Sequence, residues 1–287
     1  MSVPIATITD ESLAEKGFVW RESREKNDVK VLVCLPLERA GFVNGFSTRI
    51  GGVSPFPENA LSLAGFDDDT AENIYENRRR FLNVFDGEWR LASCWQVHSA
   101  EVRAVLTDEE VARDTEKCDG IISQMPGVLT GVKTADCVPV LIGDPRTKTF
   151  AAVHAGWRGT AQSIVAKAIE KIKTDFGADL ENLIAAIGPA ALGCCYEVGS
   201  DVIEMFRDNF SYADELLSPT KNGHALIDLH RANQRQLISS GMLMQNIYQA
   251  PLCTMERVDL FFSHRVESRL YGKTGRLMSV IGKAVVL

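Results

Sequence analysis

Five strand-like runs follow one another between residues 90 and 156, with no helical stretch between them. This order limits the possible folds, because successive parallel strands need crossover connections of a dozen or more residues, usually helices. It disfavours a doubly wound parallel sheet and predicts an α+β fold with helices packed outside a mixed or antiparallel core. The strand-like runs cover 29–37, 42–48, 90–98, 101–106, 127–133, 137–143, 150–156, 183–188 and 276–286.

The clearest helical periodicity covers residues 160–176, whose apolar side chains fall on one face. Thr160 is the expected cap and Gly177 the expected stop. Weaker patterns predict helices over 70–85, 199–210 and 229–241. No linker, repeat or low-complexity segment interrupts the chain, so we expect residues 1–287 to form a single domain.

Composition limits the partners of the protein. With 45% hydrophobic residues and 287 in all, the chain can bury a full core, and its net charge of −7 argues against nucleic-acid binding. No apolar run approaches the roughly 20 residues of a membrane span, and residues 1–20 lack the pattern of a secretory signal. Seven cysteines, an odd number, fit reduced thiols. We expect a cytoplasmic protein with a small-molecule partner, and the sequence leaves its oligomeric state open.

Three metal-type ligands lie at strand ends or turns: His98, Cys137 and His154. They are too far apart in sequence for a zinc finger, so only the tertiary fold can bring them together. If it does, two imidazoles and one thiolate suit Zn²⁺, with copper as an alternative, and three protein ligands leave a position open for catalysis. The alternative is three unrelated buried residues.

Eight segments of the chain, taken in order, resemble the YfiH or laccase-domain family, also called polyphenol oxidase and peptidoglycan editing factor. The resemblance runs from about residue 40 to the C-terminus. The segments are NGFSTRIGGVS (44–54), QVHSAEV (96–102), CDGIIS (118–123), KTADCVPVLIGD (133–144), AAVHAGWRGT (151–160), IGPAALGCCYEVG (187–199), IDLHRANQRQL (227–237) and GRLMSVIG (275–282).

The resemblance implies a single-domain αββα layered sandwich and a catalytic zinc held by His98, Cys137 and His154. It also implies a purine nucleoside phosphorylase that converts adenosine and inosine, with methylthioadenosine as a further candidate, to free base and ribose 1-phosphate. Phosphate is the co-substrate, and adenosine deaminase activity is expected to accompany phosphorolysis.

Two further site assignments combine residue chemistry with this resemblance. Arg49 is followed by two glycines, so its guanidinium and nearby backbone amides suit phosphate, with Ser47 adding a hydroxyl contact. Asp136 adjoins Cys137, and we expect it either to orient a metal ligand or to hold the turn by accepting backbone N–H bonds. It is also the candidate carboxylate for proton transfer in deamination.

Several residues near these segments receive no role from the sequence: Trp157, Arg158, Tyr196, His264 and Arg265. Cys194 and Cys195 are adjacent and lack the Cys-x-x-Cys spacing of a zinc or redox motif, so we expect them to be packing residues.

Three other functions remain open. A zinc amidase that edits peptidoglycan precursors would use the same site residues. A copper-dependent polyphenol oxidase would need many histidine ligands, and the chain has five histidines. A non-enzymatic zinc-binding module would fill the fourth zinc position with a protein ligand.

Overall fold

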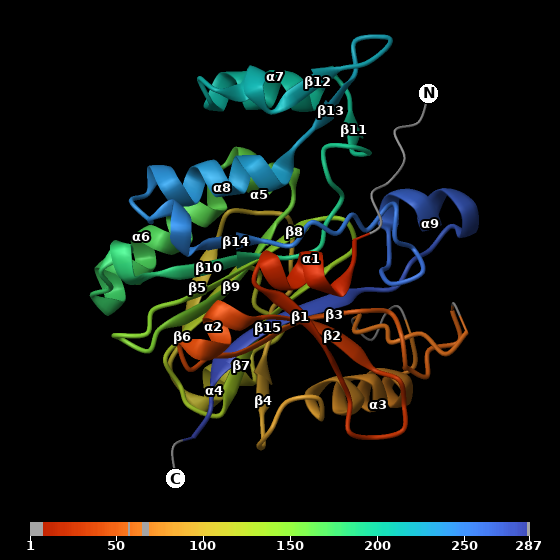
Figure 1. The fold of residues 1–287 in the computed structure, drawn as a ribbon, viewed down its shortest axis with the longest axis vertical. Coiled ribbons are helices and arrows are strands. Elements are labelled where there is room, and N and C mark those ends of the chain that lie inside the picture. The colour runs from red at the N-terminus through yellow and green to blue at the C-terminus, as the bar shows by residue number, and fades with distance from the viewer. Residues whose placement is uncertain (1–7, 57, 65–68, 286–287) are drawn as a thin grey trace.

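Two six-stranded sheets form the centre of the computed structural model, which describes residues 8–56, 58–64 and 69–285 (Figure 1). The first sheet has the spatial order β1 (Phe18–Glu22), β2 (Lys30–Cys34), β3 (Val43–Ser47), β15 (Leu277–Lys283), β7 (Val128–Thr134), β4 (Arg90–Ala92). The second has the order β14 (Ile247–Gln249), β10 (Ile184–Ile187), β8 (Val138–Gly143), β9 (Phe150–Ala155), β6 (Gly120–Ser123), β5 (Val102–Val105).

Both sheets are mixed. In the first sheet β4 and β7 are parallel and the remaining pairs antiparallel. In the second sheet the outer pairs, β5 with β6 and β10 with β14, are parallel around an antiparallel centre. A third, antiparallel sheet has the order β11 (Glu197–Val198), β13 (Ala225–Ile227), β12 (Leu217–Pro219).

The helices cover the outer faces of the two large sheets. Side chains alternate between the faces of a strand, so Leu141 points into the core between the sheets while Val140 points to the helical side. On that side α6 (Ile164–Phe176) packs over the second sheet, and α3 (Ala71–Leu82) packs through Phe81 on the first. The layers are therefore αββα, which confirms the predicted fold class.

The remaining helices are shorter or lie at the ends of the sandwich. No helix in the described residues is long and apolar enough to cross a bilayer. The bounds of these remaining helices are α1 Asp10–Glu15, α2 Leu35–Arg39, α4 Asp108–Val111, α5 Trp157–Ala161, α7 Ser200–Asn209, α8 Leu229–Ser239 and α9 His264–Tyr271. The 3₁₀ turns are at Leu180–Asn182, Ala213–Glu215 and Met244–Asn246.

Some predicted elements differ from the structure. The run 90–98 is a strand only over Arg90–Ala92, because the chain then turns away as a loop, and β6 was not predicted. The predicted helix 160–176 is two helices, α5 and α6, separated at Ser163 by a left-handed φ of 61°. Thr160 therefore lies inside α5, whereas Gly177 ends α6 in a left-handed conformation as predicted. Residues 1–7 and the end of the run 276–286 lie outside the described residues.

Candidate metal centre

The fold brings His98, Cys137 and His154 together at one end of the second sheet. Cys137 directly precedes β8 and His154 lies in β9, where Pro139 is its partner across the strand pair. The loop after β4 brings in His98. One ligand atom from each of the three side chains lies within 4.8 Å of the others, and Cys137 Sγ is 3.9 Å from His98 Nε2.

A buried carboxylate, Asp119, fixes two of these ligands from behind. Its Oδ1 accepts a 2.7 Å hydrogen bond from His154 Nδ1 and a second bond from the backbone N–H of His98. Its Oδ2 accepts bonds from the backbone N–H groups of Val97 and Ser99 and from the Ser99 hydroxyl. These bonds stabilise His98 at a φ of 58°, a conformation that non-glycine residues rarely adopt.

The donor set fits a zinc ion. Because the Asp119 carboxylate is an acceptor, His154 Nδ1 must donate, and Nε2 is the nitrogen left to bind a metal. Burial would raise the pKa of Cys137, but the charge of His154 and hydrogen bonds from both histidines lower it to about 6. The thiol is then a thiolate at neutral pH, which is the form that binds metals.

The same interactions shift the pKa values of His154 and Asp119. Burial would lower the pKa of His154, but the Cys137 thiolate and the Asp119 carboxylate raise it to about 9. Burial would raise the pKa of Asp119, yet its bonds to His154 and Ser99 lower it to about 2. A cation that binds Cys137 and His154 would therefore displace the imidazolium proton.

Gly156 leaves the space that these ligands occupy. A Cβ atom at this position would lie 3.0 Å from Cys137 Sγ and 3.0 Å from His98 Cδ2. Any larger residue would push the sulfur and the imidazole apart. The backbone after β9 therefore approaches the metal ligands as closely as a glycine permits.

The three ligands line a pocket of about 400 Å³, a size suited to a small organic substrate. Lys133 and Arg276 bring two cations to this pocket, and in the described part of the chain neither forms an ion pair with a carboxylate. One nitrogen of the Arg276 guanidinium, Nη1, donates to the carbonyl oxygens of Thr274 and Gly275. Burial lowers the pKa of Lys133, and the charges of Arg78 and Arg276 lower it further. The other lining residues are Trp95, Gln96, Thr134, Ala135 and His264.

Comparison with known proteins places this arrangement in a family. Residues 43–284 match the family model described as multi-copper polyphenol oxidoreductase laccase. The chain belongs to this laccase family. The resemblance seen in the sequence is thereby confirmed.

Curated relatives of this laccase family carry an enzyme name. A protein of Geobacillus stearothermophilus named purine nucleoside phosphorylase YlmD is 33% identical over 85% of this chain and 91% of its own length. A purine nucleoside phosphorylase of Bacteroides thetaiotaomicron is 38% identical over 82% of this chain and 89% of its own.

Solved structures of the same family share the fold. The crystal structure of YlmD from Geobacillus stearothermophilus matches with a TM-score of 0.81 at 30% identity and covers 92% of this chain and all of that one. The YfiH protein of Bacillus licheniformis also matches with a TM-score of 0.81 at 30% identity, over 88% of this chain and 96% of that one.

Asp136 holds loops together and contacts none of the three ligands through its carboxylate in the described structure. Its oxygens accept bonds from the hydroxyl groups of Thr254 and Ser263 and from the backbone N–H of Arg265. Of the two roles expected for it, the bond from Arg265 agrees with the structural one. Asp136 lies in a turn with a φ of 81°, before β8 begins at Val138.

Arg49 and Ser47 are not among the described residues that line the metal-centre pocket, and Arg49 lines a separate pocket together with Gly51 and Gly52. The Arg49 guanidinium bonds Glu267 at 2.9 Å and the carbonyl oxygens of Val258 and Phe261. The Ser47 hydroxyl accepts the backbone N–H of Met278. Both side chains are thus committed to structural contacts.

The residues that the sequence left without a role form two stacked pairs, except for His264 in the pocket. The Arg158 guanidinium lies 4.1 Å from the centre of the Trp157 ring, and Trp157 packs against the core. Arg265 lies 4.9 Å from the Tyr196 ring and donates to the Glu197 carbonyl oxygen.

Asp119, Lys133 and Arg276 were not predicted, although each lies in a segment that carries the family resemblance. The one sequence signal for Asp119 is an acidic residue directly before the apolar run that forms β6. Nothing in the sequence pairs that run with β9, and this pairing is what brings the carboxylate to His154.

Proposed function

We propose that this protein is a zinc-dependent purine nucleoside phosphorylase that acts on adenosine and inosine, with methylthioadenosine as a further candidate substrate. One observation carries the proposal: the His98, Cys137 and His154 centre shares a single pocket with Lys133 and Arg276, two cations that form no ion pair with a carboxylate among the described residues. This combination offers a metal position and an anion position close enough for two substrates to react. The relatives named purine nucleoside phosphorylase support the same reaction.

In this proposal Lys133 and Arg276 bind the attacking phosphate. The fork of an arginine matches two phosphate oxygens, and the lysine adds a point charge. Phosphate then forms a bond to C1′ of the ribose as the bond from C1′ to the purine nitrogen breaks, and the base leaves with that electron pair. Holding both reactants in one geometry is worth about 7–11 kcal/mol of the barrier.

The purine base is expected to lie against Trp95, whose side chain is 51% exposed at the pocket. An exposed indole offers a flat apolar face at little entropic cost. Gln96 holds the loop to β7, because its amide bonds both the N–H and the C=O of Lys133. When bound at His98, Cys137 and His154, Zn²⁺ supplies a Lewis acid with an open coordination position.

The accompanying reaction that we propose is deamination of adenosine, with His264 as the proton carrier in place of Asp136. His264 lines the pocket, and its Nδ1 bonds the Ser268 hydroxyl at 2.9 Å, so Nε2 is available to substrate. His264→Gln should slow inosine formation from adenosine by about a hundredfold, the usual contribution of a general acid or base. Phosphate-dependent release of hypoxanthine from inosine should change much less.

We place the enzyme in the cytoplasm, since all seven of its cysteines are unpaired in the structure. Its partner is a small nucleoside, and its net charge of −7 disfavours nucleic acid as a ligand.

Product analysis tests the proposal. Metal-replete protein should convert inosine to hypoxanthine and ribose 1-phosphate only when phosphate is present, and arsenate should substitute for phosphate. Cys137→Ala should abolish the reaction. If the protein leaves inosine intact and instead cleaves an amide of a peptidoglycan precursor, or oxidises phenols when loaded with copper, the phosphorylase proposal is wrong.

A further inference from the structure

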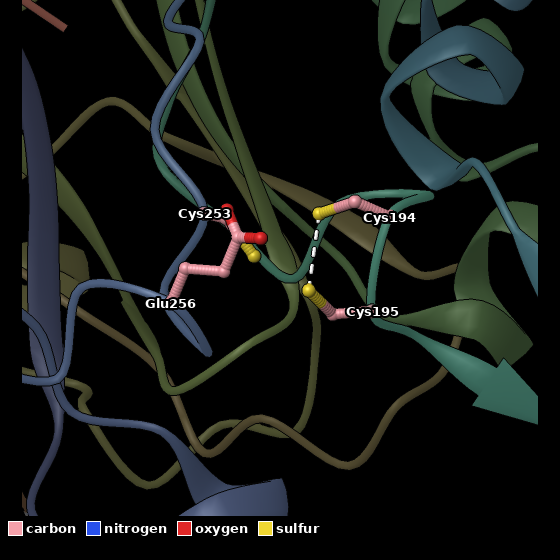
Figure 2. Close-up of side chains that lie close together, drawn as sticks. All are labelled: Cys194, Cys195, Cys253 and Glu256. Atoms are coloured by element: carbon pink, nitrogen blue, oxygen red, sulfur yellow. Dashed lines mark hydrogen bonds between the residues drawn. The ribbon is translucent and has the colours of Figure 1, made fainter. Parts of the chain in front are cut away.

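A second group of metal-type ligands lies outside the catalytic pocket. Cys194 and Cys195, in the loop before β11, face Cys253 and Glu256, in the loop after β14 (Figure 2). One sulfur or oxygen atom from each of the four side chains lies within 4.8 Å of the others, and the two adjacent sulfurs are 3.1 Å apart.

Backbone contacts bring these four side chains together. A bridge between Ala190 and Cys253 joins the two loops, through Ala190 N–H to the Leu252 carbonyl and Thr254 N–H to the Ala190 carbonyl. The loops therefore lie side by side because of their main chains, whatever the side chains bind. The backbone of the fold therefore holds the four side chains of the cluster near one another.

Each loop also turns so that both of its ligands point the same way. The Cys195 N–H donates to the Leu192 carbonyl, which closes a tight turn around the two cysteines. The Arg257 N–H donates to the Cys253 carbonyl, one helical turn that puts Cys253 and Glu256 on the same side.

Three sulfurs and one carboxylate are a donor set for a thiophilic divalent ion. Thiolates select Zn²⁺ and similar ions over Mg²⁺ and Ca²⁺, and four protein ligands complete a tetrahedron. Zinc–sulfur bonds of about 2.3 Å place tetrahedral sulfurs about 3.8 Å apart. The present separations need side-chain adjustments of less than about an ångström to reach that value.

We propose that Cys194, Cys195, Cys253 and Glu256 bind one Zn²⁺ in a closed structural site, separate from the catalytic centre. The catalytic centre has three protein ligands, whereas this site has four and no position for substrate. Its occupancy would cross-link two loops that both bond Asp136, through Ala191 N–H to its carbonyl and through the Thr254 hydroxyl to its carboxylate. The proposal does not depend on the reaction that the catalytic centre performs.

Cobalt binding to the reduced, metal-free full-length protein tests this site, because thiolate-to-cobalt charge transfer reports the number of bound sulfurs. Wild-type protein should bind two Co²⁺ ions and Cys137→Ser one. The ion that remains in Cys137→Ser should show about three times the charge-transfer intensity that this substitution removes. Zn²⁺ should displace it.

Two further variants in the Cys137→Ser background assign the ligands. Cys195→Ala should weaken cobalt binding by more than the ~10–100-fold that follows loss of a residue that only orients a ligand. Cys34→Ala, which removes a buried thiol outside both groups, should leave binding unchanged. Glu256→Gln should weaken binding without removing the three-thiolate spectrum, and Glu204→Gln, on the exposed face of α7, should not.

Three outcomes would overturn the second site. One is that Cys137→Ser protein binds no cobalt at all, and another is that its cobalt spectrum survives Cys195→Ala unchanged. A mass lower by two hydrogens in protein kept under reductant would show a Cys194–Cys195 disulfide in place of a metal site.

Discussion

At the scale of single residues, Asp119 accepts hydrogen bonds from both sides of the metal centre. Asp119→Asn puts an NH₂ group where N–H donors now converge and removes the charge opposite His154. We expect metal affinity to fall ~10–100-fold, as is typical for residues that orient a ligand. Competition with a chelator of known affinity measures the metal affinity of wild type and variant.

The matched control for Asp119 is Asp144. Asp144 is equally buried, and its carboxylate accepts bonds from Arg146 N–H and the Thr147 hydroxyl at the other end of β8. Asp144→Asn should destabilise the fold without changing metal affinity. An equal loss of affinity in both variants would mean that Asp119 acts only through general stability.

Arg276 and Arg49 separate the two possible phosphate sites. Arg276→Gln should raise the KM for phosphate about 10–100-fold, because a hydrogen bond to a charged group is worth about 1.5–3 kcal/mol. Arg49→Gln should leave this KM unchanged and lower the free energy of unfolding by about 3–5 kcal/mol, since Glu267 is then buried without its charged partner and keeps only the bonds from the Ser263 N–H and the Thr274 hydroxyl. Steady-state kinetics and urea unfolding measure the two effects, and a raised KM in Arg49→Gln would restore the original assignment.

The sequence proposed His98, Cys137 and His154 as metal ligands because their chemistry is visible in their residue types and the family resemblance adds their positions, and the structure brings the three side chains together. It assigned Arg49 to phosphate, whereas the structure pairs this side chain with Glu267, because an arginine before two glycines looks the same whether its partner is a phosphate or a carboxylate. The partner, Glu267, is 218 residues away along the printed sequence and is joined to it only by the fold.

At the scale of elements, the junction of β9 and α5 sets the room available to the metal ligands. A Cβ atom from Gly156→Ala would lie 3.0 Å from Cys137 Sγ, closer than nearly all such contacts. We expect zinc affinity to fall by tenfold or more, equivalent to about 1.4 kcal/mol or more, with the helices intact by circular dichroism. Gly199→Ala, at the start of α7 away from the ligands, is the matched control, and equal affinities in the two variants would contradict the prediction.

Element types were predictable where hydrophobic periodicity is strong. The runs that form β7, β8 and β9 are almost wholly buried and read as strands in sequence. The break between α5 and α6 was not predictable, because Ser163 adopts a left-handed conformation with no glycine to signal it. The apolar pattern continues through this break and so resembles one helix.

At the scale of the whole molecule, the run of strand-like segments between residues 90 and 156 was enough to predict an α+β class with a mixed core, although the short helix α4 (Asp108–Val111) interrupts that run. The αββα layering was expected from the family resemblance. Strand order was not predictable, because β15, near the C-terminal end, inserts between β3 and β7. Pairings between strands that lie so far apart in the sequence depend on tertiary packing, which local sequence patterns do not reveal. The pocket depends on them, since Arg276 directly precedes β15 and Lys133 lies in β7.

His230 connects two parts of this architecture and makes its stability depend on pH. It lies buried in α8, and its Nε2 bonds the Gly188 carbonyl oxygen at 2.8 Å, just after β10. Burial lowers the pKa of His230 to about 4, because the charged ring is poorly solvated there. In the unfolded chain the pKa returns to about 6.5.

Between pH 6.5 and 4 the unfolded chain therefore binds a proton at His230 that the folded protein does not. The stabilisation from the neutral ring is complete above pH 6.5, declines as the pH falls to about 4, and is constant below it. This group alone should remove about 3 kcal/mol from the free energy of unfolding over that window. His230→Gln keeps an amide donor for Gly188 and does not titrate. Urea unfolding from pH 7 to 4 measures the free energy of unfolding of wild type and variant, and the difference between the two values should shrink by that amount as the pH falls. A difference that stays constant would show that His230 does not titrate in this range.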